Sequence, residues 1–328
     1  MKILVPYPNE TAEKIRSIIG DAAEVIQSNR TPDEMLAVGG DAEIVASGRV
    51  PDEFILKATN LRMIQSFGAG IDKIGQDAII RRGDVIVCNN HVNAAEVAEY
   101  AIMLLLAVSK HILHSDREIR TGDWKMGWGG PLPNYELRNK TCLILGLGHI
   151  GTAIAKRLRA FDMRLIAATR SGTSKNERLV DSVVAINDID ESIRYADFVV
   201  LSLPLTKESE NLVDNHFISL MKRSAILVNI SRGKIIDEAA LYNALNEGRI
   251  AGAALDVWWD YPSTWGGSGK LPSENYPFHE LQNVVLSPHR AAYSENIMQD
   301  QLQFVGENIL RFIHGEKPQN IVDMNLGY

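Results

Sequence analysis

The sequence predicts an α/β protein with two domains, each with a parallel sheet of the Rossmann-like or flavodoxin-like kind. Three observations support this fold class. The chain has 328 residues, which suits two domains of ordinary size better than a single core. Short apolar runs alternate with helical stretches, as they do in βαβ units. Most of the later apolar runs are continuous, which is typical of parallel strands that are buried on both faces.

The first 90 residues predict the first sheet. A strand is expected over residues 2–7, and a helix follows over 11–20, with Thr11 as its N-cap and Gly20 at its end. Further strands are expected at 43–46, 63–66 and 85–89.

One long helical segment follows, from Asn93 to about Arg120. It contains neither Gly nor Pro, and its middle is apolar almost all round, as in a helix buried between domains or subunits. An ordinary core helix shows the same pattern, so both interpretations stay open. A loop rich in Gly, Trp and Pro over residues 122–135 then separates two units. The strands expected after it are 142–145, 164–168, 198–203, 226–230, 251–257 and 284–287.

Composition and charge argue against several classes of function. Hydrophobic residues make up 45% of the chain and the net charge is -7 with no basic block, so we expect no nucleic-acid partner. The longest strongly apolar run, residues 101–108, is far shorter than the roughly 20 residues that cross a bilayer, and no secretory signal is apparent. Cys88 and Cys142 form no CxxC pair, so we expect a cytoplasmic protein without a disulfide framework or a metal site.

A glycine-rich loop lies between a predicted strand and a predicted helix. Residues 141–151 read TCLILGLGHIG, which contains the GxGxxG motif of dinucleotide-binding βαβ units. Gly146 allows the tight turn, Gly148 lets backbone N–H groups approach a pyrophosphate, and Gly151 lets the helix pack close to the strand. The alternative is a plain strand–turn–helix, and His149 is most simply a solvated loop residue.

The end of the next strand indicates which cofactor binds. NAD sites usually place an acidic residue there to hold the ribose 2′-hydroxyl. Thr169 stands at this point, followed by Arg170 and Ser171. No carboxylate would repel a 2′-phosphate, and a guanidinium can bind one bidentately, so we favour NADP(H), with NAD(H) as the alternative. Arg170 could instead stack on the adenine or face solvent.

Two side chains near strand ends are candidates for catalysis. Arg232 follows the apolar run VNIS, and His289 ends the run LSPH. Ligands of open α/β sheets bind beyond the carboxyl ends of the strands. Arginine can hold a carboxylate and polarise a carbonyl, and histidine can move the proton that accompanies hydride transfer. Each residue alone would more often be structural.

At this point the sequence resembles the D-isomer-specific 2-hydroxyacid dehydrogenases, a family that includes phosphoglycerate, glycerate, glyoxylate/hydroxypyruvate and formate dehydrogenases. The resemblance covers nearly the whole chain. Its landmarks are SFGAGID (66–72), ELRNKTCLILGLGHIGTAIAKRL (136–158), LSLPLT (201–206), LMKRSAILVNISRG (220–233), AALDV (253–257) and NVVLSPH (283–289).

The resemblance implies roles for individual residues. Arg232 matches the arginine that binds the substrate carboxylate and carbonyl, and His289 matches the acid/base histidine. Backbone groups of Ala69 and Gly70 match the turn that holds the substrate carboxylate, and Asn93 matches an asparagine beside the substrate in formate dehydrogenases. Cofactor contacts are implied for His149, Ile150, Leu203, Pro204, Ile230 and Asp256, of which Asp256 matches the aspartate near the nicotinamide carboxamide.

One departure from the family pattern concerns the partner of His289. The family usually has a Glu there, which raises the pKa of the histidine, but the matching position holds Tyr261, next to Asp260. A phenol stays neutral near pH 7 and stabilises imidazolium less than a carboxylate does. Either residue could orient His289, and formate dehydrogenases have Gln at this position. The aromatic side chains that could wall the site, or pack between domains, are Trp258, Trp259 and Trp265.

The expected architecture is a discontinuous substrate-binding domain, 1–97 plus 289–328, and a dinucleotide-binding domain, 98–288, with the active site in the cleft between them. We expect a homodimer that reduces a small 2-oxo acid such as glyoxylate or hydroxypyruvate with NADPH. Two alternatives stay open. One is a dinucleotide-sensing binding protein of the C-terminal-binding corepressor type, and the other is an enzyme that resembles formate dehydrogenase.

Overall fold

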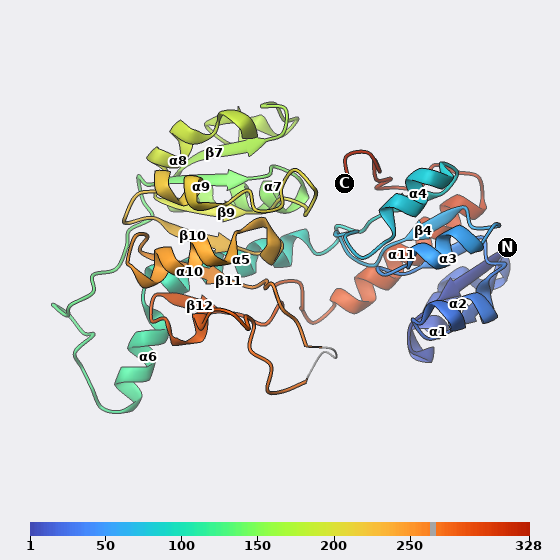
Figure 1. Ribbon diagram of the computed structural model, residues 1–328, viewed down its shortest axis with the longest axis horizontal. Helices are drawn as coiled ribbons and strands as arrows, with labels where there is room; N and C mark the ends of the chain where they lie inside the picture. The colour runs from blue at the N-terminus through green and yellow to red at the C-terminus, as the bar shows by residue number, and fades with distance from the viewer. Residues whose placement is uncertain (263–266) are drawn as a thin grey trace. The chain divides into compact units, whose positions relative to one another are not determined.

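The computed structural model describes residues 1–262 and 267–328 and divides the chain into two compact units (Figure 1). Unit 1 comprises Met1–Asn93 and Ser294–Tyr328, and unit 2 comprises Ala94–Tyr293. The chain therefore passes from one unit to the other after Asn93 and again after Tyr293. The sequence places these crossings a few residues away, after residues 97 and 288.

Unit 1 is built on a five-stranded parallel sheet in the order β2-β1-β3-β4-β5, the flavodoxin-like order. Its strands are β1 (Lys2–Val5), β2 (Glu24–Gln27), β3 (Ile44–Ala46), β4 (Met63–Gln65) and β5 (Ile86–Cys88). Its helices are α1 (Asn9–Ile19), α2 (Pro32–Gly39), α3 (Asp52–Lys57), α4 (Gln76–Arg82) and α11 (Ile297–Ile313). Successive strand residues point to opposite faces, so α1 and α11 cover one apolar face and α2, α3 and α4 cover the other.

Unit 2 contains a seven-stranded parallel sheet in the order β12-β11-β10-β9-β6-β7-β8, which is the Rossmann order with one further strand. Its strands are β6 (Thr141–Leu145), β7 (Arg164–Thr169), β8 (Ser182–Ala185), β9 (Phe198–Leu201), β10 (Ile226–Asn229), β11 (Gly252–Leu255) and β12 (Val284–Leu286). Its helices are α5 (Ala94–Ser109), α6 (Ile112–Arg120), α7 (His149–Leu158), α8 (Asp190–Tyr195), α9 (Asn215–Leu220) and α10 (Glu238–Asn246). The two parallel sheets confirm the predicted fold class.

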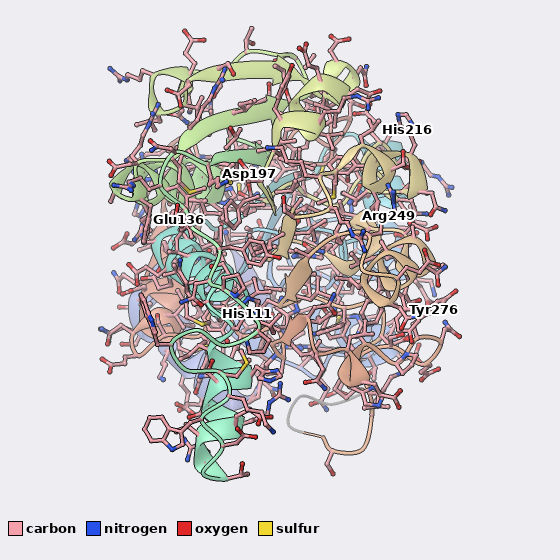
Figure 2. All side chains as sticks on the ribbon, turned by 90° about the vertical axis from the view of Figure 1, so that its left-hand side faces the viewer. His111, Glu136, Asp197, His216, Arg249 and Tyr276 are labelled. Atoms are coloured by element: carbon pink, nitrogen blue, oxygen red, sulfur yellow. The ribbon has the colours of Figure 1, made fainter. Side chains whose placement is uncertain are left out.

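The amino ends of β6 and β9 are joined by polar contacts of Asp197, which directly precedes β9 and is labelled in Figure 2. Its carboxylate accepts a hydrogen bond from the backbone N–H of Thr141 at 2.9 Å and from Nζ of Lys222 at 2.9 Å. This residue precedes β9 and binds the first residue of β6. It therefore fixes the register of the two central strands at the edge that faces away from the glycine-rich loop.

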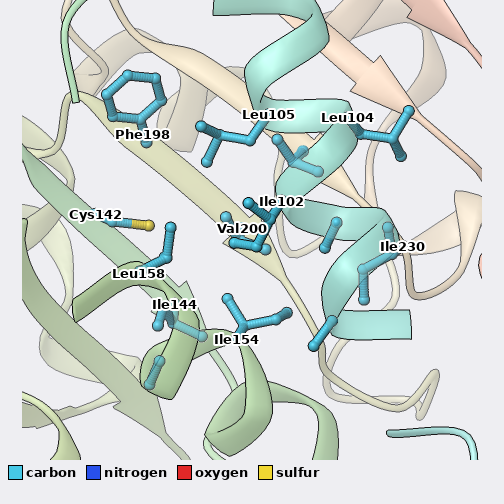
Figure 3. Close-up of a cluster of buried hydrophobic side chains, with 14 of the residues drawn as sticks. Ile102, Leu104, Leu105, Cys142, Ile144, Ile154, Leu158, Phe198, Val200 and Ile230 are labelled. Atoms are coloured by element: carbon cyan, nitrogen blue, oxygen red, sulfur yellow. The ribbon is translucent and has the colours of Figure 1, made fainter. Parts of the chain in front are cut away.

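The long helical segment predicted from Asn93 is two helices. His111 has a left-handed φ of 51°, and α5 and α6 meet there at a 60° bend. Burial explains the break, since α5 packs against α7 and β10 within unit 2, whereas α6 has no buried residue. Figure 3 shows this core, in which Ile102 and Leu105 of α5 belong to the same cluster of buried side chains as Ile154 and Leu158 of α7. Within the described residues no single helix has the length and hydrophobicity of a membrane span, and α5 and α6 reach them only together.

Two strands of the structure are not predicted by the sequence, and one helix begins earlier than predicted. The unpredicted strands, β2 and β8, are at sheet edges and mostly half-buried, so they lack a continuous apolar run. Helix α1 begins two residues before Thr11, because Pro8 stands at its N-cap and its carbonyl accepts the N–H of Thr11. It ends as predicted at Gly20, whose φ is 58°.

Candidate active site

All seven strands of unit 2 are parallel, so the residues that follow them share one edge of the sheet. In order along this edge are Ser287–His289 after β12, Asp256 after β11, Ile230–Arg232 after β10, Ser202–Pro204 after β9, the glycine-rich loop after β6 and Thr169 after β7. The direction of the chain order reverses between β6 and β9, where Rossmann sheets bind dinucleotides. The candidates for acid/base chemistry and for binding the far end of a dinucleotide thus lie at opposite ends of one edge.

The glycine-rich loop has the geometry of a phosphate-binding turn. Gly146 has φ 95°, and a Cβ on Gly151 would lie 2.0 Å from the carbonyl oxygen of Gly146, so the first turn of α7 packs directly on the loop. A Cβ on Gly148 would meet nothing within 4 Å, which leaves its outer side open to a ligand. The N-cap residue of α7 is Gly148, which has no side chain to cap the helix, so the first N–H groups at His149 and Ile150 can bind an anion. The residues present therefore fit a dinucleotide pyrophosphate.

The loop after β7 folds back on itself. Thr169 Oγ1 donates to the carbonyl of Thr173 at 3.1 Å, and the hydroxyls of Ser171 and Thr173 are 3.0 Å apart. Arg170 is exposed between them. Asn176 then donates from Nδ2 to Thr152 Oγ1 at 3.0 Å, which ties this loop to the first turn of α7.

Lys175, which no sequence motif indicates, lies on this same loop. Desolvation by burial and, next, the positive charge of Lys175 hold the pKa of His149 below its usual value. The ammonium group is therefore within electrostatic reach of the first residue of α7. The sequence signal was a second cation a few residues after Arg170, within residues 170–176, which contain no acidic residue.

Three further residues of the implied cofactor site lie in the middle of the edge. The side chain of Leu203 faces Gly146, since a Cβ on Gly146 would lie 3.1 Å from Leu203 Cδ2. The carbonyl of Leu203 accepts a hydrogen bond from the hydroxyl of Ser231, and the carbonyl of Pro204 accepts one from Ser209 at 2.7 Å. Ile230 is buried at the end of β10.

The segment that carries Arg232 is held by the end of its own strand. Asn229 is fully buried, accepts the N–H of Ser231 at 3.0 Å and donates to the carbonyl of Arg232 at 2.9 Å. Arg232 Nη1 donates to the carbonyl of Ser231 at 2.7 Å. A Cβ on Gly233 would lie 2.3 Å from the backbone of Trp258, so this loop is in close contact with the chain after β11.

His289 pairs with Tyr261. Its Nδ1 is 2.9 Å from the Tyr261 hydroxyl, and the ring centroids are 5.5 Å apart. The same hydroxyl accepts the backbone N–H of Trp258 at 3.1 Å. The other candidate partner, Asp260, accepts the backbone N–H of Glu274 at 3.3 Å. This arrangement leaves Nε2 as the ring nitrogen that is not directed at Tyr261.

Asp256 is buried and both of its carboxylate oxygens accept hydrogen bonds from the loop that carries His289. The neighbouring tryptophans also pack within unit 2. Trp258 Nε1 donates to the carbonyl of Ser287 at 2.8 Å, and the Trp259 ring stacks on Phe278. Trp265 lies outside the described residues.

The remaining candidates, Ala69, Gly70 and Asn93, lie in unit 1. The turn after β4 is fastened by Asn89, whose Nδ2 donates to the carbonyl of Ala69 at 3.1 Å. The amide oxygen of Asn93 is buried and accepts no hydrogen bond from the described residues. It therefore has an unused acceptor at the end of unit 1.

Comparison with known proteins identifies the family to which the chain belongs. Residues 102–291 match the model for the NAD-binding domain of the D-isomer-specific 2-hydroxyacid dehydrogenases. The chain is 36% identical over 270 residues to a glyoxylate reductase from Pyrococcus horikoshii, which covers 81% of this chain and 77% of the relative.

Two solved structures are similar over 98% of this chain. One is an NADPH-dependent glyoxylate/hydroxypyruvate reductase from Sinorhizobium meliloti in complex with NADP and malonate, with a TM-score of 0.81, 26% identity and 97% of that chain covered. The other is an acyclic imino acid reductase in complex with NADPH and D-Arg, with a TM-score of 0.82, 29% identity and 100% of that chain covered. The chain belongs to the family of D-isomer-specific 2-hydroxyacid dehydrogenases.

Proposed function

We propose that this chain is an NADP(H)-dependent reductase of small 2-oxo acids, with glyoxylate and hydroxypyruvate as the first candidates. Membership of the family supplies the reaction class, which is hydride transfer between a nicotinamide and a 2-oxo or 2-hydroxy acid. The names of the relatives support the substrates. The observation that carries the proposal is the His289–Tyr261 pair at 2.9 Å, on the same sheet edge as Arg232 and the glycine-rich loop.

Each site residue would have a separate role in the reaction. When bound, the cofactor supplies the hydride that is added to the carbonyl carbon. Arg232 would hold the substrate carboxylate and stabilise the charge that develops on the carbonyl oxygen. His289 would donate the proton from Nε2 to that oxygen, while Nδ1–H donates to Tyr261 and fixes the ring. In unit 1, Ala69, Gly70 and Asn93 stay the candidates for binding the substrate.

The preference for NADP(H) is proposed for the loop after β7. Thr169 presents no carboxylate to a 2′-phosphate, Arg170 is exposed beside Ser171, and Lys175 adds a second positive charge. The solved relatives that bind NADPH or NADP support this choice. A site selective for NAD(H) would need an acidic residue at position 169, to bind the ribose 2′-hydroxyl.

A second candidate function is the reduction of 2-imino acids, and Tyr261 favours it. Reduction of a carbonyl produces an alkoxide that needs a proton from His289. A protonated imine accepts a hydride without that proton and yields a neutral amine. Because a phenol stabilises imidazolium less than a carboxylate does, Tyr261 weakens the acid that only the carbonyl reaction requires. The similarity to an acyclic imino acid reductase supports this candidate.

The assay that tests the proposal uses purified protein, NADPH or NADH, and a panel of 2-oxo acids with and without ammonium or methylamine. Loss of reduced-nicotinamide absorbance with glyoxylate or hydroxypyruvate alone supports the first candidate. Loss that requires the amine supports the second. Tight binding of NADPH with no turnover of any substrate would contradict both and favour a dinucleotide-sensing protein. Formate with NAD tests the formate dehydrogenase alternative in the same assay.

We also infer that the enzyme is a cytoplasmic homodimer and that α6 and the loop after it form the contact. α6 has no buried residue, and this arm carries exposed apolar side chains. They are Ile112, Leu113, Ile119, Trp124, Trp128 and Leu132. Large exposed apolar patches usually mark an interface, and this arm supplies six such side chains within 21 residues. The free thiols of Cys88 and Cys142, both buried, suit a reducing compartment.

A further inference from the structure

We propose that Asp256 is a positioning residue for His289, and that it acts by fastening the loop that carries this histidine to the end of β11. The inference rests on the proposed function for the role of His289. It differs from the family resemblance, which implies a contact between Asp256 and the nicotinamide carboxamide. The side chain is only 1% exposed, so its partners are groups of its own chain.

Asp256 binds the loop on both sides of His289. Oδ1 accepts hydrogen bonds from the Ser287 hydroxyl and from the backbone N–H of Arg290 at 2.9 Å. Oδ2 accepts the backbone N–H of Ala291 at 2.9 Å. Hydrogen bonds to a buried carboxylate are charge-assisted and roughly twice as strong as neutral ones. One side chain therefore fixes the residues two before, one after and two after the histidine.

The backbone of His289 needs such a restraint. Its φ is 54°, a left-handed conformation that is costly for a residue with a Cβ. Strained backbone of this kind persists only where surrounding contacts determine it. Asp256 and the residues that follow it after β11 supply these contacts. Trp258 Nε1 donates to the carbonyl of Ser287, and the Tyr261 hydroxyl forms a hydrogen bond with Nδ1 of His289.

The same network reaches both chain crossings of unit 2. Ser287 Oγ is 2.9 Å from the Tyr100 hydroxyl, and Tyr100 lies on α5, which begins directly at the first crossing. Arg290 and Ala291 lie just before the second crossing, which follows Tyr293. The hydrogen bonds of Asp256 therefore connect the loop that carries His289 to the residues next to both chain crossings of unit 2.

Hydrogen exchange tests the restraint independently of any substrate. Asp256→Asn keeps the shape of the side chain, but its NH2 group cannot accept the N–H of Ala291 or Arg290. We expect the peptide that contains residues 287–293 to exchange at least tenfold faster in Asp256→Asn than in the wild type, while peptides of β6 and β9 are unchanged. Unchanged exchange of this peptide would overturn the proposal, even if the wild type proved to turn over none of the substrates.

Kinetics then separate a positioning role from a carboxamide contact. If Asp256 positions His289, Asp256→Asn lowers kcat by about 100-fold, as a displacement of about 1 Å can do, and the solvent isotope effect on kcat increases. The variant would keep the wild-type ratio of activities with NADPH and its 3-acetylpyridine analogue. Loss of that discrimination, with loop exchange and isotope effect unchanged, would assign Asp256 to the carboxamide instead.

Asp197→Asn is the matched control. This aspartate also accepts backbone and side-chain hydrogen bonds within unit 2, but at the amino ends of the strands. We expect it to lower the melting temperature while kcat, the isotope effect and exchange of residues 287–293 stay unchanged. Tyr100→Phe is the milder test, because it removes only the hydroxyl that contacts Ser287, and a kcat loss of a few-fold is expected. Equal losses of kcat in Asp197→Asn and Asp256→Asn would contradict the proposal.

Discussion

At the scale of single residues, the partner of His289 determines how strong an acid the site contains. Tyr261 Oη already accepts the N–H of Trp258, so it can also accept Nδ1–H, or donate its own proton to Nδ1. A carboxylate could only accept, and its charge would stabilise imidazolium. The phenol therefore orients the ring with little gain in acidity, which is the physical difference between this chain and the usual family pattern.

Tyr261→Glu should extend the reduction of 2-oxo acids to higher pH. A carboxylate beside Nδ1 raises the pKa of the imidazolium, so the protonated donor persists further into the alkaline range, and we expect the limb of the kcat/KM profile to move up by about one unit or more. Tyr261→Phe, which removes the hydroxyl alone, should lower kcat without an upward movement of the limb. A pH profile of Tyr261→Glu that coincides with the wild type would show that this position does not tune His289.

The second residue-scale prediction concerns the choice between NADPH and NADH. Removing a charged hydrogen bond to phosphate costs about 1.5–3 kcal/mol, so Arg170→Ala should raise KM for NADPH about 10- to 100-fold and leave KM for NADH nearly unchanged. Lys175→Ala should act in the same direction with a smaller effect, since a lysine contributes as a point charge.

Arg164→Ala provides the control for cofactor choice, because Arg164 is an exposed cation at the opposite end of β7. Its KM values for both cofactors should equal those of the wild type. If Arg170→Ala weakened NADPH and NADH by the same factor, Arg170 would be stacking on the adenine and the preference would have another source.

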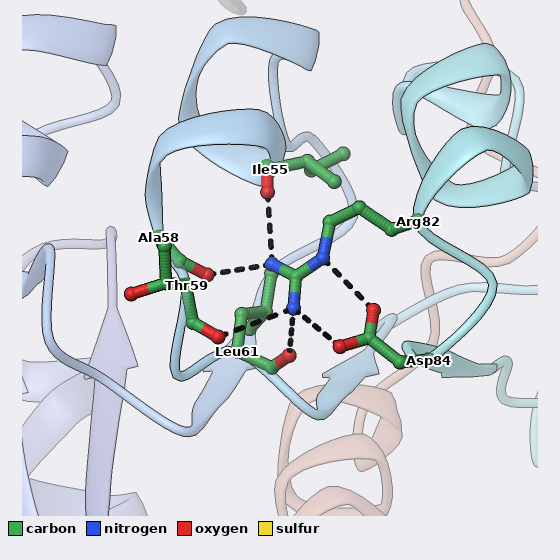
Figure 4. A network of polar contacts seen from close by, with 6 residues as sticks. All are labelled: Ile55, Ala58, Thr59, Leu61, Arg82 and Asp84. Carbon is green, nitrogen blue, oxygen red and sulfur yellow. Dashed lines mark hydrogen bonds and ion pairs between the residues drawn. The ribbon is translucent and has the colours of Figure 1, made fainter.

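At the scale of elements, the connection between α3 and β4 is held by a single side chain of α4. Arg82 donates to the carbonyls of Ile55, Ala58 and Leu61 and forms an ion pair with Asp84 (Figure 4). Arg82 is mostly buried, whereas Asp84 is 60% exposed. The carbonyl contacts therefore carry most of the stability, since exposed ion pairs contribute little.

Arg82→Ala should lower the free energy of unfolding of unit 1 by about 2 kcal/mol, because it leaves several carbonyls of a packed turn without a donor. Asp84→Asn, which removes only the exposed ion pair, should change it by less than about 0.5 kcal/mol. All five tryptophans lie in the sequence of unit 2, so urea unfolding by circular dichroism reports both units and tryptophan fluorescence reports unit 2 alone. Equal effects of the two variants would contradict this assignment.

The elements also show what the sequence could and could not predict. Continuous apolar runs identified the central strands within one or two residues, because these strands are buried on both faces. The edge strand β8 was missed because half-buried residues leave no such run. Spacing could offer Tyr261 or Asp260 as the partner of His289, but only three-dimensional contacts distinguish them. Lys175 and the hydrogen bonds of Asp256 depend on residues from separate segments, which no motif reports.

At the scale of the whole molecule, the arm formed by α6 and the loop to residue 135 is the proposed contact of the dimer. The sequence pattern alone directed attention to the apolar middle of the preceding helix, but α5 is used inside unit 2. The apolar surface that remains is on the arm, which Figure 1 draws extending from the rest of unit 2. Trp128 is fully exposed and Trp124 is 78% exposed. Exposure of two large aromatic side chains in water is unfavourable, and burial against a second copy would relieve it.

The wild type should therefore sediment as a dimer at micromolar concentration, and the double variant Trp124→Ser with Trp128→Ser should sediment as a monomer. Aromatic anchors at the centre of an interface typically contribute 2 kcal/mol or more each, so the dissociation constant should rise by about 1,000-fold or more. Tyr195→Ser removes a 60% exposed aromatic residue on α8 of the same unit and should leave the dimer unchanged. A wild type that is monomeric, or a double variant that dimerises as strongly as the wild type, would show that the arm has another role.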